Sequence, residues 1–205
     1  MIRAVTTTMA RCAAHPVCIG VGGVSGVGKT TFLRAHAAAT DGIDEYVSAS
    51  RIVQEIIAPA SFEEMDRLPE SERVALRTLF APLLRQRRDR VPGRLLVDSH
   101  FTHRNRTTGE IERILTEAEL PLYDALVLLS PPVRELLRFR RGDSRARPPL
   151  TRQQLEELLA CERAEALRLA QCANVPLLII DAVDLDDRLA ALRDFLDRHF
   201  PMVMS

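Results

Sequence analysis

The sequence predicts an α/β fold, a three-layer αβα arrangement in which a parallel sheet of five strands is covered by helices on both faces. Short apolar runs alternate along the chain with longer segments of helical pattern, which is typical of a parallel sheet with helical connections. Each run is apolar throughout rather than at every second position, as expected of strands buried on both faces. A glycine-rich turn joins the first apolar run to the first helical segment.

The first half of the chain begins with two predicted strands and two predicted helices. Residues 17–21 form an apolar run that ends in glycines, and they predict a buried strand. Residues 28–39 are rich in alanine, which favours a helix. A weaker strand is predicted at residues 44–47, and a helix follows over residues 50–58, before Pro59.

A long amphipathic helix is predicted over residues 70–90, because apolar and charged side chains occupy opposite faces. Pro92 and Gly93 end it before the third strand, residues 95–97. The apolar face consists of Val74, Leu76, Leu79, Phe80, Leu83 and Leu84. The other face carries Arg73, Arg77, Arg85, Arg87, Arg88 and Arg90, which we interpret as solvated or, alternatively, as a wall for an anionic ligand.

The second half of the chain contains the last two predicted strands and three helices. Residues 125–129 and 176–180 are the apolar runs, and helical patterns cover residues 133–140, 151–172 and 185–199. There is no internal repeat and no low-complexity linker. These elements are therefore expected to form one domain.

Composition and charge exclude several classes of partner. The chain has 205 residues and a formal net charge of +0, so no global field attracts nucleic acid or an anionic membrane. No apolar run approaches the ~18 residues of a membrane span, and the four cysteines have no metal-ligand spacing. We expect a cytoplasmic domain over residues 15–205, preceded by a flexible extension over residues 1–14, in which Met9 is an alternative start.

Lys29 is the single lysine of the chain, and every other basic side chain apart from histidine is arginine. A planar guanidinium does not replace a compact ammonium at every site. The one lysine retained in such a background is therefore predicted to lie where an ammonium is required.

Residues 23–30 read GVSGVGKT, the G-x-x-x-x-G-K-T pattern of a phosphate-binding loop in its required place between strand and helix. Glycines let consecutive backbone N–H groups turn toward phosphate oxygens, and the following helix directs its positive end at the same anion. Lys29 would lie along the terminal phosphates, and the Thr30 hydroxyl would bind Mg²⁺. The predicted fold is thus that of a P-loop NTPase. The predicted phosphate-binding residues are Gly23, Val24, Ser25, Gly26, Val27, Gly28, Lys29, Thr30 and Thr31.

A polar segment, VDSHFTHRN at residues 97–105, follows the third predicted strand. Asp98 ends the apolar run where a P-loop protein needs a carboxylate to hold Mg²⁺, usually through water, or to orient the nucleophile. Asp181, after the last strand, and the pair Asp44 and Glu45 are alternatives for this role. The acceptor-side candidates of the segment are His100, His103 and Arg104.

Residues 138–147 contain five arginines within ten residues, in a stretch with loop composition. Given the phosphate loop, we interpret residues 138–150 as a lid whose arginines close over the phosphates and exclude water. A solvated charge run or an RNA-binding patch is the alternative, although no platform of aromatic side chains accompanies it. The catalytic candidates of this lid are Arg140, Arg141 and Arg145.

These motifs together resemble the archaeal-type adenylate kinases, a family of P-loop nucleoside-monophosphate kinases. GVSGVGKTT resembles the phosphate loop of the family, and VDSH its Asp-Thr-His or Asp-Gly-His. RRGDSRAR resembles its arginine-rich lid, Glu162–Ala166 its Asn-Arg-x-x-Ala, and Glu64–Pro69 its Met-Arg-x-Leu-Pro stretch. The resemblance implies strand order 2-3-1-4-5, ATP with Mg²⁺ as donor, and a part for Arg163 on the substrate side. It also allows a homo-oligomer.

The departures from the family lie on the acceptor side. Its Gly-Tyr-x-Pro-Gly-Leu-Pro segment is replaced here by residues 109–115, which look helical, and the arginines expected near the acceptor phosphate fall at Phe62 and Asp66. Losing two charge-assisted contacts removes roughly 1.5–3 kcal/mol each from the binding of a phosphate dianion. The lid is also one residue shorter between Asp143 and Arg145.

The sequence therefore predicts a kinase that transfers the γ-phosphoryl group of ATP to a nucleotide, a nucleoside or a related hydroxyl-bearing metabolite other than AMP. Adenylate kinase proper is one alternative. A regulatory P-loop NTPase that acts with a macromolecular partner is another, although the guanine-reading Asn-Lys-x-Asp is absent. Helices over residues 48–92 would form the acceptor side, where Ser50 and Arg51 follow the second strand.

Overall fold

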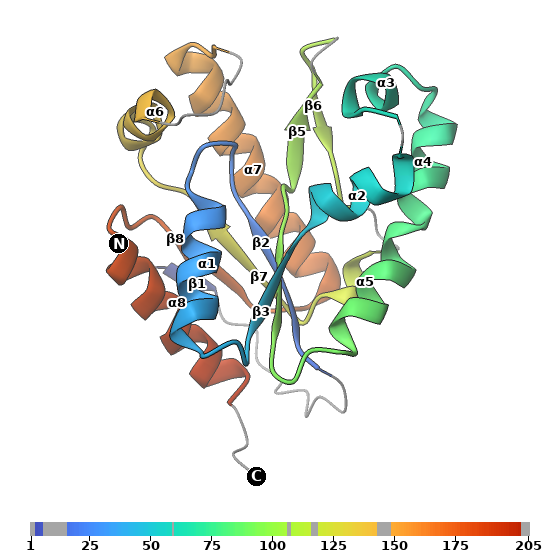
Figure 1. The fold of residues 1–205 in the computed structure, drawn as a ribbon. Helices are drawn as coiled ribbons and strands as arrows, with labels where there is room; N and C mark the ends of the chain where they lie inside the picture. The colour runs from blue at the N-terminus through green and yellow to red at the C-terminus, as the bar shows by residue number, and fades with distance from the viewer. Residues whose placement is uncertain are drawn as a thin grey trace.

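A six-stranded sheet forms the centre of the fold (Figure 1). The computed structural model describes residues 3–5, 16–58, 60–105, 108–115, 119–142 and 149–201. In spatial order the strands are β1 (Arg3–Val5), β8 (Leu177–Ile180), β7 (Ala125–Leu129), β2 (Cys18–Gly22), β4 (Leu95–Asp98) and β3 (Glu45–Ser48). The five from β8 to β3 run parallel. In chain order they are arranged 2-3-1-4-5 from the β3 edge, so the predicted α/β fold class is confirmed.

The sixth strand, β1, was not predicted. Arg3–Val5 pair antiparallel with Leu177–Ile179 at the β8 edge. The extension expected over residues 1–14 therefore contains a strand that the sequence did not predict. Their three-residue ladder protects an otherwise unpaired edge of the sheet, and a signal this short does not stand out in a sequence.

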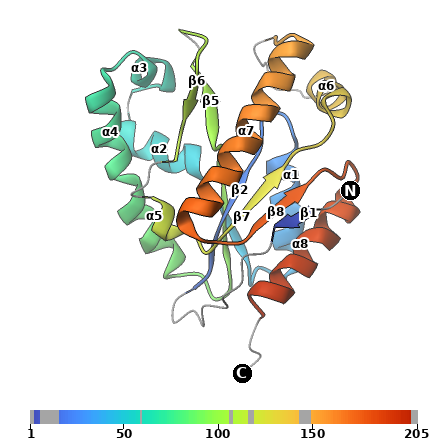
Figure 2. The same ribbon diagram turned by 180° about the vertical axis from the view of Figure 1, so that it is seen from behind.

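Helices cover both faces of the sheet, as Figures 1 and 2 show from opposite sides. The first apolar core lies between the sheet and the helices α1 (Lys29–Ala39) and α8 (Leu185–His199). The second lies between the sheet and α2 (Ala49–Ile57), α5 (Phe80–Arg88) and α7 (Arg152–Ala173). Successive residues of a strand point alternately into the two cores, so Cys18 belongs to the second core and Ile19 to the first. The predicted strands and helices at these places are thereby confirmed to within a few residues.

The helix predicted over residues 70–90 is two helices, α4 (Glu70–Thr78) and α5, joined at Leu79. Pro82 explains the break, because it has no N–H to donate to the carbonyl of Thr78 and its ring crowds that carbonyl. The apolar face is correspondingly interrupted. Phe80 and Leu84 are buried, but Leu79 is 52% exposed.

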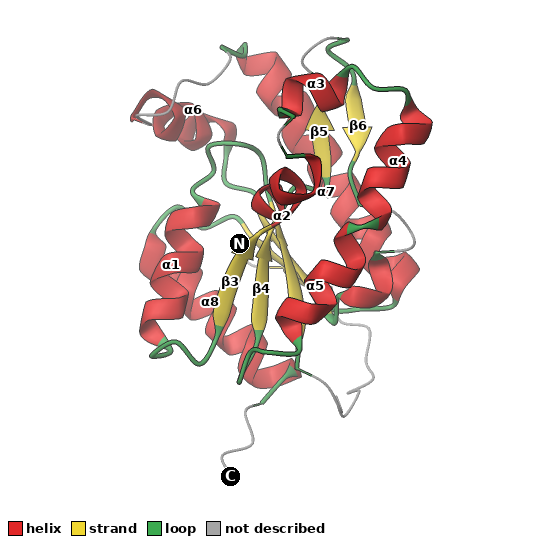
Figure 3. Ribbon diagram, turned by 45° about the vertical axis from the view of Figure 1, so that its right-hand side comes forward, coloured by secondary structure: helices red, strands yellow, loops and turns green. Residues whose placement is uncertain are grey.

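A second, two-stranded sheet stands beyond the carboxyl end of β4 (Figure 3). It consists of β5 (Thr102–Arg104) and β6 (Ile111–Arg113) in antiparallel pairing. The helix predicted over residues 109–115 is therefore wrong. Ile111 and Ile114 have helical spacing, but the ladder with β5 and a turn through Gly109, with φ of 77°, decide the conformation.

Two further helices, α3 (Phe62–Asp66) and α6 (Val133–Gly142), border the carboxyl end of the large sheet. A short 3₁₀ turn (Leu120–Leu122) precedes β7 at the amino end of the sheet. Because α6 continues to Gly142, the loop predicted from residue 138 is wrong for its first five residues. The rest of the predicted lid from 143 to 148, which includes Arg145, lies outside the described residues.

Within the described ranges, no helix combines the length and the apolar character that crossing a membrane requires.

Candidate functional site

The phosphate loop lies between β2 and α1, at the carboxyl end of the sheet. Gly23 has a φ of 142°, and a Cβ there would approach the carbonyl oxygen of Leu129 to 2.8 Å. Gly28 is the N-cap of α1 with a φ of 93°. Both positions require glycine, since side chains are strained in this region of φ.

The first turn of α1 is suited to an anion. Gly28 provides no side-chain cap for the N–H groups that follow it, and these groups have no partner within the helix. Together with the helix dipole they favour a negatively charged group at this point. The residues present therefore fit the phosphates of a nucleotide.

Lys29 lies inside this loop and is 7% exposed. Its ammonium donates to the carbonyl of Gly23 at 2.5 Å and lies 3.4 Å from both ring nitrogens of His100. The distance from Nζ to Asp98 Oδ1 is 3.9 Å. Because an ammonium can only donate, a hydrogen bond in this contact requires a ring nitrogen of His100 as the acceptor.

Thr30 and Asp98 meet at the same point. The Thr30 hydroxyl donates to Asp98 Oδ2 at 3.0 Å, and the parallel register that pairs Val21 with Asp98 brings the two elements together. Mg²⁺ prefers oxygen ligands and keeps several waters when it binds phosphates. A hydroxyl beside a carboxylate fits that ion. The described residues contain no cluster of three or more metal-ligating side chains, and magnesium bound through phosphates and water does not require one.

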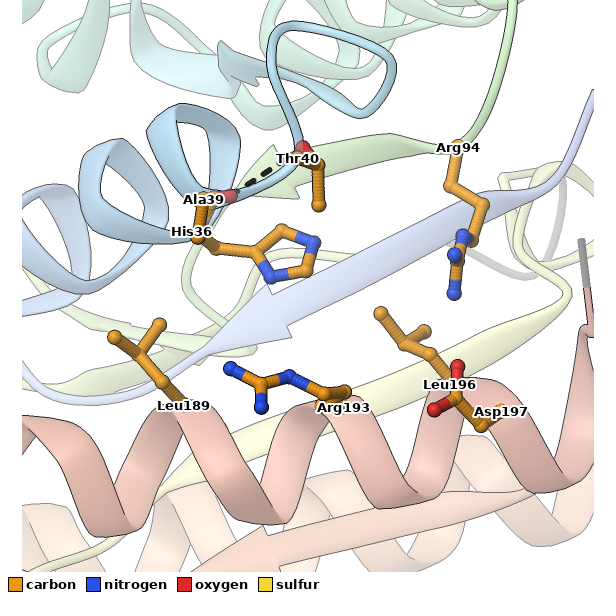
Figure 4. A pocket seen from close by; sticks show the side chains of 8 residues that line it. All are labelled: His36, Ala39, Thr40, Arg94, Leu189, Arg193, Leu196 and Asp197. Atoms are coloured by element: carbon orange, nitrogen blue, oxygen red, sulfur yellow. Dashed lines mark hydrogen bonds between the residues drawn. The ribbon is translucent and has the colours of Figure 1, made fainter.

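Asp44, an alternative to Asp98, lies far from the phosphate loop. It is fully buried and bonds His36 Nε2 at 2.9 Å and Arg94 Nε at 3.2 Å. Burial alone would raise the pKa of Asp44, but the hydrogen bond from His36 and the charge of Arg94 hold that pKa below its ordinary value. A cavity of about 250 Å³ between α1, α8 and the start of β4 includes His36 and Arg94 in its wall (Figure 4). This cluster anchors the amino end of the sheet.

The arginines of the predicted lid have separate environments. Arg140 on α6 donates from Nη1 to the carbonyl of Ser25 in the phosphate loop at 2.8 Å. Arg141 is exposed, and Arg138 pairs with Glu135 at 2.9 Å. Among the described arginines of the predicted lid, only Arg140 donates a hydrogen bond to the phosphate loop.

The predicted acceptor-side residues are spread around the opening above the sheet. His100 contacts Lys29, whereas His103 and Arg104 lie on β5 of the hairpin. Ser50 bonds Ser48 at 2.8 Å. The other two candidates are Arg51, exposed on α2, and Arg163, half-buried on α7. The structure brings His100 to the loop and does not bring the others into direct contact with it.

The hairpin is joined to α4 by an ion pair. Arg73 Nη1 donates to Glu112 Oε2 at 3.0 Å, and Asn105 Nδ2 donates to Glu112 Oε1 at 2.9 Å. Burial would raise the pKa of Glu112, but Asn105 and Arg73 hold it below its ordinary value. The sequence analysis interpreted the arginines of this helix face as solvated or as a wall for an anionic ligand. At Arg73 both interpretations are corrected, because its guanidinium pairs with Glu112.

Two buried charged residues beside the loop were not predicted. Arg188 on α8 is 4% exposed and donates to the carbonyls of Val27 and Ala182 at 3.0 and 2.8 Å. Burial lowers the pKa of its guanidinium, and Asp184 offsets part of this effect. Glu162 on α7 accepts from the Gly23 N–H at 2.9 Å. Each lies on the apolar stripe of its helix, which is the signal that the sequence offered.

Comparison with known proteins agrees with this arrangement. The family model AAA_17, described as an AAA domain, matches residues 22–156, more than half of the chain. No curated protein sequence gives a match.

Solved structures share the fold at low sequence identity. A shikimate kinase from Bacteroides thetaiotaomicron has a TM-score of 0.58 and 16% identity, over 88% of this chain and 98% of that one. A gluconokinase from Sinorhizobium meliloti 1021 has a TM-score of 0.52 and 17% identity, over 90% and 95%. A deoxyadenosine kinase from M. mycoides has a TM-score of 0.58 and 11% identity, over 89% and 100%.

Proposed function

The chain belongs to the AAA domain family, and on that premise we propose that it is an ATP-dependent small-molecule kinase. It transfers the γ-phosphoryl group of ATP, with Mg²⁺, to a nucleotide, a nucleoside or a related hydroxyl-bearing metabolite. The three similar structures are named as kinases of shikimate, gluconate and deoxyadenosine. Their names support a small acceptor rather than a macromolecular partner.

The observation that carries this proposal is the meeting of four side chains at the phosphate loop. Lys29 lies within hydrogen-bond or ion-pair distance of His100 and Asp98, and Thr30 bonds Asp98. The first turn of α1 and the segment at the end of β4 supply these four side chains. A loop that only binds phosphate needs Lys29 and Thr30. The histidine and the carboxylate add groups that can orient an acceptor and take its proton.

Each group has a role that follows from its position. MgATP, when bound, supplies the transferable phosphoryl group. The loop N–H groups and Lys29 hold the phosphates and balance the negative charge that develops on them. Thr30 and Asp98 would hold the metal, which would balance charge on the phosphates when bound. Arg140, with Arg141 and Arg145, neutralises charge from the side of α6.

The acceptor side supports a substrate other than AMP. A β-hairpin occupies the place where the archaeal-type adenylate kinases have a Gly-Tyr-x-Pro-Gly-Leu-Pro segment. Residues 62 and 66, where those kinases have arginines near the acceptor phosphate, are not arginine here. We assign acceptor binding to Ser50, Arg51, His100, His103, Arg104 and Arg163. If the acceptor is a hydroxyl, Asp98 or His100 takes its proton, and a phosphate acceptor needs no base.

The test is ADP formation from ATP in the presence of separate acceptors. The panel contains AMP, the other nucleoside monophosphates, nucleosides and small hydroxyl-bearing metabolites, and Lys29→Met is the negative control. We expect stimulation by one chemical class other than AMP, absent in the control variant. Rapid turnover of AMP to ADP would identify adenylate kinase proper. Stimulation only by a protein or nucleic acid would instead identify a regulatory NTPase, and either result rejects the proposal.

A further inference from the structure

Glu162 is a buried carboxylate near the site that is bound by backbone groups of two segments. It lies on α7, is 1% exposed, and accepts four hydrogen bonds. Oε1 accepts from the N–H groups of Gly23 and Phe101 at 2.9 and 3.0 Å. Oε2 accepts from the N–H and the hydroxyl of Thr102 at 2.7 and 2.5 Å.

These four bonds connect two parts of the site that are otherwise separate in the chain. Gly23 begins the phosphate loop, and its carbonyl accepts from Lys29. Phe101 and Thr102 directly follow His100 and begin the hairpin of β5 and β6. The distance between the Lys29 ammonium and the His100 ring is therefore set by two segments that share one carboxylate.

A side chain with a purely structural role would need fewer hydrogen bonds than the four that Glu162 accepts. Glu165, one turn further along α7, shows what such a role looks like. It is 4% exposed and pairs with Arg168 at 2.7 Å and with Arg113 of β6 at 3.2 Å. Glu165 thus fastens the hairpin to α7 through arginines, whereas Glu162 accepts from three backbone N–H groups and one hydroxyl.

Glycine at position 22 reinforces the same connection. A Cβ there would collide with the ring of Phe101, which is fully buried against the end of β2. Phe101 thus packs on Gly22, directly before the phosphate loop, while Glu162 bonds the N–H groups of both Gly23 and Phe101. Because protein interiors are close-packed, a shift of the loop is passed on to a segment held in this way.

We propose that Glu162 is a positioning residue that couples the phosphate loop to the acceptor-side hairpin. When nucleotide binds, a displacement of the loop at Gly23 is thereby transmitted to Phe101 and Thr102, and through them to His100. This inference rests on the proposed function, since it takes nucleotide as the ligand of the loop. It assigns a role in the reaction to a residue that acts through Gly23, Phe101 and Thr102.

The test compares Glu162→Gln with Glu165→Gln, a matched change of the same charge on the same helix. ADP with Mg²⁺ is the probe, its dissociation constant is measured by calorimetry, and backbone amide shifts are followed by NMR. In the wild type and in Glu165→Gln, we expect ADP to shift the resonances of Gly23, Phe101 and Thr102. In Glu162→Gln, Gly23 still responds, whereas the shifts of Phe101 and Thr102 are at least threefold smaller.

Turnover provides a second reading. Misplacing a positioned group by about 1 Å costs about 10²-fold, so we expect Glu162→Gln to lower the kcat for the acceptor by about 10- to 100-fold. Its affinity for ADP stays within about threefold, because the loop N–H groups and Lys29 remain. Glu165→Gln keeps kcat within about threefold, since it leaves the loop contacts intact.

Two outcomes overturn the inference in distinguishable ways. If ADP shifts Gly23 but Phe101 and Thr102 respond equally in both variants, the coupling is absent and the proposed function stands. If ADP does not bind the wild type, the proposed function itself fails. Should Glu162→Gln not fold, Glu162→Asp keeps the charge but withdraws the carboxylate by one methylene from its four donors, and an unchanged response of the Phe101 and Thr102 amides to ADP in that variant overturns the coupling.

Discussion

Replacement of Lys29 by arginine keeps the positive charge of the phosphate loop and changes only its shape. Lys29 is 7% exposed, and its ammonium is enclosed by the Gly23 carbonyl at 2.5 Å and the His100 ring at 3.4 Å. The larger guanidinium must displace one of them, and such overpacking costs about 1–3 kcal/mol. It also moves the charge away from the position that the transferring group requires.

The size of the effect follows from these contacts. Loss of one preorganised donor lowers kcat by about 10²–10³, or about 2.7–4 kcal/mol. We therefore expect a fall of that size in Lys29→Met, which removes the charge at similar volume. In Lys29→Arg, which retains the charge, we expect kcat to fall by more than about tenfold, the equivalent of about 1.4 kcal/mol.

The assay is acceptor-dependent ADP formation, with the thermal unfolding midpoint measured in parallel. Arg134→Lys, the reverse exchange at a side chain that is 82% exposed on α6, is the control and should have no effect. Turnover in Lys29→Arg within about threefold of the wild type would refute the reasoning that this site requires an ammonium. A loss accompanied by general unfolding would refute it as well.

Three further predictions concern the metal, the loop and the amino end of the sheet. Thr30→Val removes the hydroxyl that bonds Asp98, so the Mg²⁺ concentration for half-maximal turnover rises by about tenfold or more; an unchanged magnesium titration contradicts this. Gly23→Ala forces a Cβ to 2.8 Å from a carbonyl, whereas Gly42→Ala, at φ of 74°, has nothing within 4 Å. Chemical denaturation should therefore show about 1 kcal/mol lost at position 42 and clearly more at position 23, and equal losses would refute the clash. The folded-state pKa of Asp44 is lowered, so its contribution to unfolding free energy is present above its unfolded pKa of about 3.9 and is lost as pH falls through the folded value. The stability difference between wild type and Asp44→Asn should shrink below about pH 4; a difference that stays constant on acidification would be inconsistent with this linkage.

The parallel sheet and the phosphate loop could be predicted because their signals are local. Continuous apolar runs such as 125–129 identify strands without knowledge of their partners. The glycines and Lys29 of the loop act on their own backbone and on the ligand that they bind. The position of Asp98 followed from the same reasoning, since the ends of neighbouring parallel strands meet at one edge of a sheet.

The hairpin could not be predicted in this way, because its evidence is divided. Ile111 and Ile114 fit a helix by spacing, and the ladder that makes Ile111–Arg113 a strand comes from Thr102–Arg104. The break at Leu79 is a different case, because its signal is local. Pro82 cannot donate a hydrogen bond to the carbonyl of Thr78, and the sequence prediction did not take this into account.

Buried charges with backbone partners were the hardest to foresee. Glu162 bonds Gly23 across 139 positions of the chain, and Arg188 bonds Val27 across 161. No spacing rule links such residues. Apart from the motif resemblance of Glu162–Ala166, their trace in the sequence is a charge on a helix face that is otherwise apolar, as Leu158 and Leu169 make it around Glu162.

The most direct test of a small-molecule kinase follows the γ-phosphorus of ATP by ³¹P NMR in the presence of the acceptor panel and Mg²⁺. The account predicts a new phosphate resonance on one non-AMP acceptor, formed in step with ADP and absent in Lys29→Met. Recovery of the phosphorus only as inorganic phosphate, with no acceptor labelled, would contradict it.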